Sequence, residues 1–124
     1  MEPTLPDLGV LRRCWTGFED AGTTHPVLVG GIAIGGPLPV IIAGPCAVES
    51  FEQTLAVARA VRGAGIGIMR GGAFKPRTYP GSFQGLGTEG LEILAEVRRE
   101  TGLAIVTEVL DPRLVEQVAA VADM

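Results

Sequence analysis

Apolar positions follow two patterns along the chain, and together they predict strands that alternate with helices. Residues 38–46, LPVIIAGPC, form a continuous apolar run, which is typical of a strand buried on both faces. Similar, mainly apolar runs occupy residues 66–70 and 103–109. Each run is followed by a stretch in which apolar residues recur every three or four positions, as on one helix face. This order predicts a parallel α/β sheet, because strands joined through helices run in the same direction.

Capping residues set the bounds of the first helix. Ser50 precedes it, and Gln53 three positions later completes a capping box. Gly63 and Gly65 stop it, since glycine is unfavourable inside a helix. The residues predicted to share its buried face are Thr54, Ala58 and Val61.

The second and third helices carry comparable signals. Thr88 can cap the second helix, and Gly102 ends it. Asp111 is the predicted N-cap of the third, with Pro112 at the first helical position. The predicted buried faces contain Leu91, Leu94 and Ala95 in the second helix and Leu114, Val115 and Val118 in the third.

The two ends of the chain complete the predicted organisation. Residues 25–36 contain two short apolar runs broken by a Gly-Gly pair, which predicts a β-hairpin. We interpret residues 1–26 as an N-terminal extension with a short helix near residues 8–18, and residues 121–124 as the start of a fourth strand. Residues 27–124 then hold three to four β/α units, too few to close a (β/α)8 barrel. The pattern alone leaves open whether the sheet is doubly wound or part of a barrel.

Composition narrows the class of protein. The 124 residues are 47% hydrophobic, which suits one domain with a packed core. The longest apolar stretch is far below the roughly 20 residues of a membrane helix, and the N-terminus lacks a secretory pattern, so we expect a cytoplasmic protein with no membrane partner. A net charge of −4 argues against a nucleic-acid partner. The chain has two cysteines, Cys14 and Cys46, and we interpret Cys14 as structural. We interpret the only histidine, His25, as a turn residue.

One segment of this acidic chain contains only positively charged residues among its charged positions. No acidic residue lies between Glu52 and Glu89, and the chain's only lysine, Lys75, lies there with Arg70 and Arg77. The predicted loop over residues 71–87 is long for a β-α connection, and such length is usually functional. Three cations without a local counter-acid repel one another unless an anion joins them. The loop therefore predicts a site for a phosphorylated or multiply anionic small molecule, with a solvated basic turn as the alternative.

The remaining polar candidates follow the other strands. Ligands of parallel α/β folds collect at the carboxyl ends of the strands. Cys46 and Glu49 follow the first strand and Glu108 lies at the end of the third, so they are expected on the same rim as the basic loop. On spacing alone, Cys46 is a buried structural cysteine rather than a metal thiolate, because few other ligands are present.

Three segments, in this order and spacing, resemble a known family. They are AGPCAVES at residues 43–50, RGGAFKPRTYPGSFQGLGTEGL at residues 70–91 and VTEVLDP at residues 106–112. They are similar to 3-deoxy-D-arabino-heptulosonate 7-phosphate (DAHP) synthases of the short microbial type I branch, which is related to the 3-deoxy-octulosonate 8-phosphate synthases. The resemblance extends over residues 27–124. It implies a partial (β/α)8 TIM barrel, the N-terminal half of such a synthase, preceded by a short β-hairpin.

The resemblance also implies a reaction and roles for individual residues. Phosphoenolpyruvate would condense with erythrose 4-phosphate and release phosphate, with a divalent metal (Mn²⁺, Fe²⁺, Zn²⁺ or Co²⁺) polarising the aldehyde. The implied roles are metal binding for Cys46, phosphoenolpyruvate binding for Arg70, a catalytic position between the two substrates for Lys75, binding of the sugar phosphate for Arg77 and Thr78, and a catalytic position near the reacting centre for Glu108.

Two departures from the family pattern limit what is expected of this chain. Family members commonly read R-T-S-P-Y-S-F, whereas Tyr79 replaces the serine here and Gly81 the tyrosine. The family's other metal ligands come from later strands, which have no counterpart in these residues. We therefore expect the 124 residues alone to be inactive, and to form homo-oligomers through exposed strand edges.

Two alternatives remain. The chain could be a non-catalytic half barrel that self-associates or binds anions. It could also be an octulosonate 8-phosphate synthase that uses arabinose 5-phosphate, although the segment KPRT argues against that branch.

Overall fold

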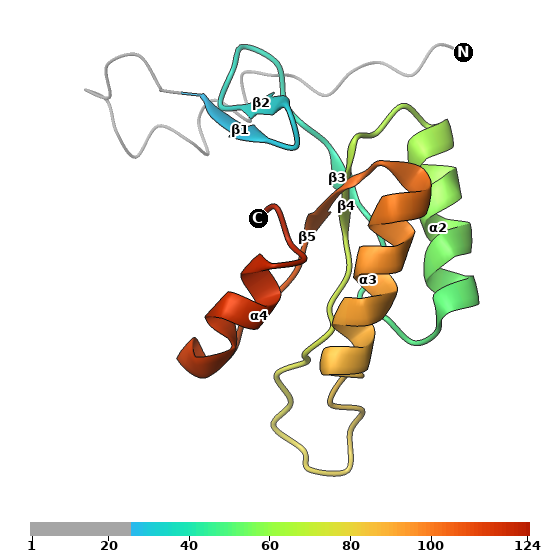
Figure 1. Ribbon diagram of the computed structural model, residues 1–124, viewed down its shortest axis with the longest axis vertical. Coiled ribbons are helices and arrows are strands. Elements are labelled where there is room, and N and C mark those ends of the chain that lie inside the picture. The colour runs from blue at the N-terminus through green and yellow to red at the C-terminus, as the bar shows by residue number, and fades with distance from the viewer. Residues whose placement is uncertain (1–25) are drawn as a thin grey trace.

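A computed structural model describes residues 26–124 and places a parallel sheet at the centre of the fold (Figure 1). The strands β3 (Ile42–Ala43), β4 (Ile68–Arg70) and β5 (Ala104–Val106) lie in that order and run parallel. The helices α2 (Phe51–Gly63) and α3 (Thr88–Thr101) connect them and pack side by side. The predicted α/β order is confirmed. The helix predicted near residues 8–18, Cys14 and His25 lie outside the described residues.

The two faces of the sheet have separate apolar cores. Side chains alternate along a strand, so Met69 and Ile105 point to one face and Ile68 and Ala104 to the other. The first pair packs in the main core with buried residues of both helices, among them Leu55, Ala58, Leu91, Leu94 and Val97. The second pair packs against Val29 and neighbouring apolar residues.

The predicted hairpin is confirmed and covers this second face. Strands β1 (Val27–Val29) and β2 (Ile32–Ile34) pair antiparallel across Gly30 and Gly31. A Cβ at Gly30 would lie 2.5 Å from the Cβ of Ala104, so the turn lies directly against β5. The hairpin therefore packs against the sheet on the side away from α2 and α3.

The strand predicted over residues 38–46 is much shorter than expected. Only Ile42 and Ala43 form β3, and both are half-buried, Ile42 against the second core and Ala43 against the main core, so the predicted burial on both faces is only partial; Ile41, just before the strand, is 65% exposed. Among the described strands, β3 has one neighbour, and Pro37 and Pro39 lack the N–H group that a ladder requires. The continuous apolar run here thus corresponds to a short, half-buried strand at the edge of the described sheet.

The predicted caps are confirmed at one helix and wrong at another. The Ser50 hydroxyl accepts a hydrogen bond from the Gln53 N–H at 3.2 Å. At α3 the N-cap is Gly87, which makes no side-chain cap bond, and Thr88 is already the first helical residue. The Thr88 hydroxyl instead accepts from Gln117 Nε2 at 2.9 Å. Gly102, with φ of 71°, ends α3 as predicted.

The third helical segment begins with a tighter turn. A 3₁₀ helix, η1 (Pro112–Leu114), precedes α4 (Val115–Ala119), and the Asp111 carboxylate accepts from the Arg113 N–H at 2.9 Å. Bonds from the Arg113 side chain and backbone hold the pKa of Asp111 below its usual value. Because a 3₁₀ turn has three residues rather than 3.6, the apolar stripe shifts, and Val118 is buried while Val115 is 48% exposed. The predicted burial of Val115 is wrong.

Residues 121–124 lie along the free edge of β5 without forming the predicted strand. The Asp123 N–H donates to the Ile105 carbonyl at 2.8 Å, and the Thr107 N–H donates to the Met124 carbonyl at 3.2 Å. The Ile105 N–H, however, donates to the Asp123 carboxylate at 2.9 Å instead of to a main-chain carbonyl. This side-chain acceptor interrupts the ladder. Within residues 26–124, no helix is long and apolar enough to cross a bilayer.

The two predicted cap residues give a direct test of this part of the fold. We expect Ser50→Ala to lower the free energy of unfolding by about 1 kcal/mol, because the Gln53 N–H loses its acceptor. Thr88→Ala is the matched control, with a change of only a few tenths of a kcal/mol expected, roughly that of an ordinary surface substitution. Urea unfolding followed by circular dichroism measures both. Equal losses would contradict the assignment of Gly87 as the N-cap of α3.

Candidate active site

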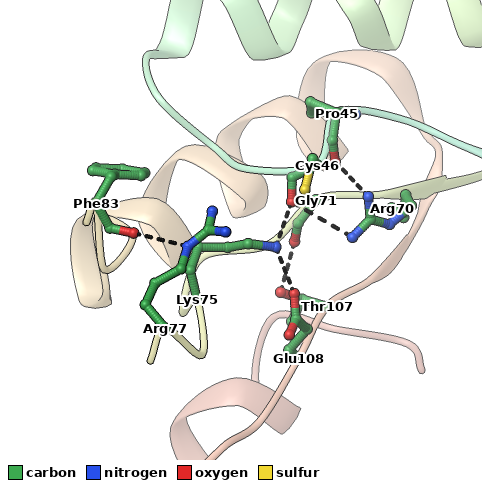
Figure 2. Close-up of polar contacts among 9 residues, drawn as sticks. All are labelled: Pro45, Cys46, Arg70, Gly71, Lys75, Arg77, Phe83, Thr107 and Glu108. Atoms are coloured by element: carbon green, nitrogen blue, oxygen red, sulfur yellow. Dashed lines mark hydrogen bonds and ion pairs between the residues drawn. The ribbon is translucent and has the colours of Figure 1, made fainter. Parts of the chain in front are cut away.

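The carboxyl ends of the three parallel strands bring several predicted site residues together (Figure 2). Cys46 follows β3, Arg70 ends β4 and Glu108 follows β5. Lys75, in the loop after β4, reaches back to the same place. The predicted rim therefore gathers Cys46, Arg70, Lys75 and Glu108.

Lys75 is the central residue of this cluster. Its side chain is only 6% exposed, and its ammonium group donates to the Cys46 carbonyl at 2.7 Å and to Glu108 Oε1 at 2.8 Å. A charge buried to this extent is stable only when it is paired and hydrogen-bonded. Lys75 thus links the segment after β3 to the segment after β5, across the end of β4.

Backbone hydrogen bonds hold the strand ends at fixed spacing beneath Lys75. The Gly71 N–H donates to the Val106 carbonyl at 3.0 Å, and the Thr107 hydroxyl donates to the Gly71 carbonyl at 2.7 Å. On the other side, the Val48 N–H donates to the Gly72 carbonyl at 2.9 Å. Sequence reasoning missed Thr107, because a threonine after a strand carries no signal of a bond to another strand.

Arg70 shares an acceptor with Lys75. Its guanidinium donates to the Pro45 carbonyl at 3.1 Å and to the Cys46 carbonyl at 3.5 Å. The Cys46 carbonyl therefore lies between the two cations, as Figure 2 shows. The Cys46 residue itself is exposed, so its interpretation as a buried structural cysteine is wrong. The turn at Gly44 and Pro45 leaves it on the rim.

Arg77 and Thr78 lie farther along the loop, and both are exposed. Arg77 Nε donates to the Phe83 carbonyl at 3.3 Å, a contact within the loop itself. The three cations thus do not meet at one point. Glu49 is also exposed on the surface.

The base of the loop is fixed although residues 71–87 form no helix or strand. The Lys75 N–H donates to the Gln84 carbonyl and the Gly87 N–H to the Ala73 carbonyl, both at 2.9 Å. At the tip, a Cβ on Gly81 would lie 2.6 Å from Cε1 of Tyr79. The two departures from the family pattern are therefore in contact, and because Tyr79 is 71% exposed its ring could turn away from a larger residue at position 81.

The three cations lack a local counter-acid, as the sequence indicates, but Lys75 has one from elsewhere in the fold. Glu108 neutralises it, and this carboxylate lies 33 residues away in the sequence. Only the fold reveals the pairing, because no acidic residue lies near Lys75 in the sequence. The excess positive charge of the rim comes from Arg70, and Arg77 adds positive charge farther along the loop.

The described residues do not by themselves form a metal centre. Among residues 26–124, no three His, Cys, Asp or Glu side chains lie close enough to hold one ion. A catalytic zinc-type site needs about three protein ligands. The Cys46 thiol can therefore supply one ligand here, and the donor set is incomplete without others.

A cavity of about 410 Å³ lies at the opposite end of the strands, between the end of α3 and the end of α4. It is lined by Ala95, Arg98, Arg99, Gly102, Ala120 and Val121. Arg98 is paired with Asp123, and Arg99 with Glu96. Both arginines of this cavity are thus already engaged by carboxylates, and the strand ends remain the candidate site.

A comparison with protein families finds a match over most of the chain. Residues 18–124 match the model of the DAHP synthetase I family.

Individual relatives agree with this match. A phospho-2-dehydro-3-deoxyheptonate aldolase of Thermotoga maritima is 45% identical over 96 residues, which are 77% of this chain and 28% of the relative. A 2-dehydro-3-deoxyphosphooctonate aldolase of Magnetococcus marinus is 38% identical over 110 residues, covering 82% of this chain and 38% of the relative. A crystal structure of the Thermotoga maritima DAHP synthase superposes with a TM-score of 0.73 at 43% identity, over 79% of this chain and 28% of that one. The chain thus spans well under half the length of these relatives.

The Lys75–Glu108 pair predicts a measurable loss of stability. Glu108→Gln keeps an oxygen acceptor but removes the charge that faces the buried ammonium, and we expect the free energy of unfolding to fall by about 1–2 kcal/mol. Glu100→Gln, which breaks the exposed pair with Arg59, is the control, with a change below about 0.5 kcal/mol. Urea unfolding compares the two. Equal losses would show that burial of Lys75 adds nothing to the pair.

Proposed function

The chain belongs to the DAHP synthetase I family, and from this premise we propose that its strand ends and basic loop form the substrate-binding part of a 3-deoxy-7-phosphoheptulonate synthase. The proposed reaction is the aldol-type condensation of phosphoenolpyruvate with erythrose 4-phosphate. It gives 3-deoxy-D-arabino-heptulosonate 7-phosphate and phosphate, the first step of the shikimate pathway to aromatic amino acids. The described segment then corresponds to the first units of a (β/α)8 barrel.

The position of Lys75 is the observation that carries the proposal. Its ammonium lies at the mouth of the sheet, almost fully buried, and uses two of its three N–H donors on the Cys46 carbonyl and Glu108. The third donor remains for an oxygen of a substrate. A donor already fixed and desolvated needs little reorganisation when negative charge develops next to it. This is the role that we propose for Lys75, between the two substrates.

The two arginines supply the charge that an anionic substrate needs. Arg70 uses two of its five N–H donors on main-chain carbonyls, which orients the guanidinium plane at the strand end. Its other donors suit the carboxylate or phosphate of phosphoenolpyruvate, since a guanidinium binds such groups in a bidentate manner. Arg77 and Thr78, exposed on the loop, are proposed to bind the phosphate of erythrose 4-phosphate.

Glu108 and Cys46 have supporting roles in this proposal. Glu108 orients the Lys75 ammonium through the 2.8 Å ion pair and thereby lies next to the reacting centre. Cys46 is proposed as one ligand of a divalent metal, which would polarise the sugar aldehyde. Because the described residues offer no complete ligand set, the other ligands would have to come from outside residues 26–124.

An octulosonate 8-phosphate synthase is the second candidate. The 38% identity to the Magnetococcus marinus octulosonate aldolase favours it, and its substrate would be arabinose 5-phosphate. The KPRT segment at residues 75–78 favours the heptulosonate reaction instead. The expected homo-oligomer and cytoplasmic location remain predictions.

Binding of phosphoenolpyruvate tests the main proposal. We expect Arg70→Gln to weaken this binding by roughly tenfold to a hundredfold, the worth of one or two charge-assisted hydrogen bonds. Arg62→Gln, an exposed arginine at the far end of α2, is the matched control and should leave the affinity unchanged. Isothermal titration calorimetry at fixed salt measures both. If the unaltered chain shows no binding at millimolar ligand, or both variants bind equally weakly, the proposed role of Arg70 is wrong.

A comparison of sugar phosphates separates the two candidate reactions. We expect erythrose 4-phosphate to raise the melting temperature more than arabinose 5-phosphate at equal concentration, because stabilisation follows affinity for the folded state. Inorganic phosphate serves as the control for a general anion effect. Stronger stabilisation by the five-carbon sugar would favour the octulosonate reaction.

A further inference from the structure

The contacts of Lys75 with the Cys46 carbonyl and Glu108 lie next to a glycine, Gly72. A Cβ placed on Gly72 would lie 2.5 Å from Lys75 Nζ, 2.8 Å from the Cys46 carbonyl oxygen and 2.9 Å from Glu108 Oε1. The three atoms come from three different segments of the chain, and each lies closer than a carbon atom normally approaches. The ammonium, the carbonyl and the carboxylate therefore meet in the volume that any other residue at position 72 would fill.

The backbone at this position has little freedom to move away. Gly72 is buried and forms a parallel bridge with Ala47, and its carbonyl accepts from the Val48 N–H at 2.9 Å. Its neighbour Gly71 is bonded to Val106 and Thr107. An added methyl group would therefore press on the cluster rather than displace the strand.

Two of the three atoms near the added Cβ can move away by side-chain rotation. Lys75 Nζ and Glu108 Oε1 are the ends of flexible side chains, whereas the Cys46 carbonyl is main chain. A methyl group at position 72 would thus move the ammonium and the carboxylate outward, and the 2.8 Å approach to the Cys46 carbonyl would also require a small shift of the main chain there. The neighbouring Gly71 differs, since a Cβ there would meet apolar atoms, Leu94 Cδ2 at 3.0 Å and Val48 Cγ2 at 3.2 Å.

We propose that Gly72 is a positioning residue of the candidate active site. The absence of a side chain there allows the Lys75 ammonium to lie between the Cys46 carbonyl and Glu108. It thereby fixes where the third N–H donor points. That this donor serves phosphoenolpyruvate or the sugar aldehyde rests on the proposed function, whereas the placement of Lys75 by Gly72 does not.

The chain offers a selective probe of this placement, because Lys75 is its only lysine. Trinitrobenzenesulfonate labels amines, and mass spectrometry of peptides separates Lys75 from the α-amino group. In Gly72→Ala we expect Lys75 to be labelled about tenfold faster than in the unaltered chain, since a buried group reacts only as it becomes exposed. Gly36→Ala is the matched control, because Gly36 is exposed and a Cβ there would have no neighbour within 4 Å; its labelling rate should stay unchanged.

Stability measurements keep the test decisive if the variant folds poorly. Gly72→Ala should lower the urea concentration at the unfolding midpoint. This decrease should be smaller in a Lys75→Ala background, because Lys75 Nζ, the atom nearest to the added methyl group, is then absent. An equal loss in both backgrounds would overturn the proposal. A folded Gly72→Ala chain with the labelling rate of the unaltered chain would overturn it as well.

Binding of phosphoenolpyruvate then separates this inference from the proposed function. In the first outcome, labelling behaves as expected, Gly72→Ala weakens phosphoenolpyruvate binding about tenfold and Gly36→Ala does not. The placement of Lys75 by Gly72 and the proposed function are then both supported. If labelling behaves as expected but the unaltered chain does not bind phosphoenolpyruvate, the placement of Lys75 by Gly72 stands and the proposed function fails.

Discussion

The burial of one ammonium group governs the arrangement of the strand ends. Lys75 is removed from water and must recover the lost hydration through its bonds to the Cys46 carbonyl and Glu108. Those partners belong to segments that follow β3 and β5, and Lys75 itself follows β4. The ion pair can therefore form only when all three strands are in register, which makes the local chemistry dependent on the whole sheet.

Local signals in the sequence were sufficient for the order of elements. The hairpin, the parallel strands, the Ser50 cap and the Gly102 stop each depend on a few adjacent residues, and all are found in the structure. The errors occur where neighbours distant in sequence decide. The Thr88 hydroxyl accepts from Gln117, 29 residues away, instead of capping α3, and residues 121–124 do not form a strand because the Asp123 carboxylate takes the place of a main-chain acceptor.

Only part of the candidate site was predictable from the sequence, because Thr107 and Gly72 gave no signal and the contacts between the residues were not evident. The rule that ligands gather at the carboxyl ends of parallel strands brought Cys46, Arg70, Lys75 and Glu108 to one rim. It gave no indication that Lys75 is neutralised by Glu108, nor that Gly72 supplies the volume in which they meet. Such facts depend on side-chain reach across three strands, and periodicity along a single chain contains no information about that reach.

The hairpin determines from which direction a molecule can approach. Ile32 lies against Gly67, at the beginning of β4, and Gly30 lies against Ala104, at the beginning of β5. The amino ends of these two strands are thus sealed by apolar contacts. The rim with Lys75 is at the other end of the strands, so the hairpin leaves the candidate site uncovered.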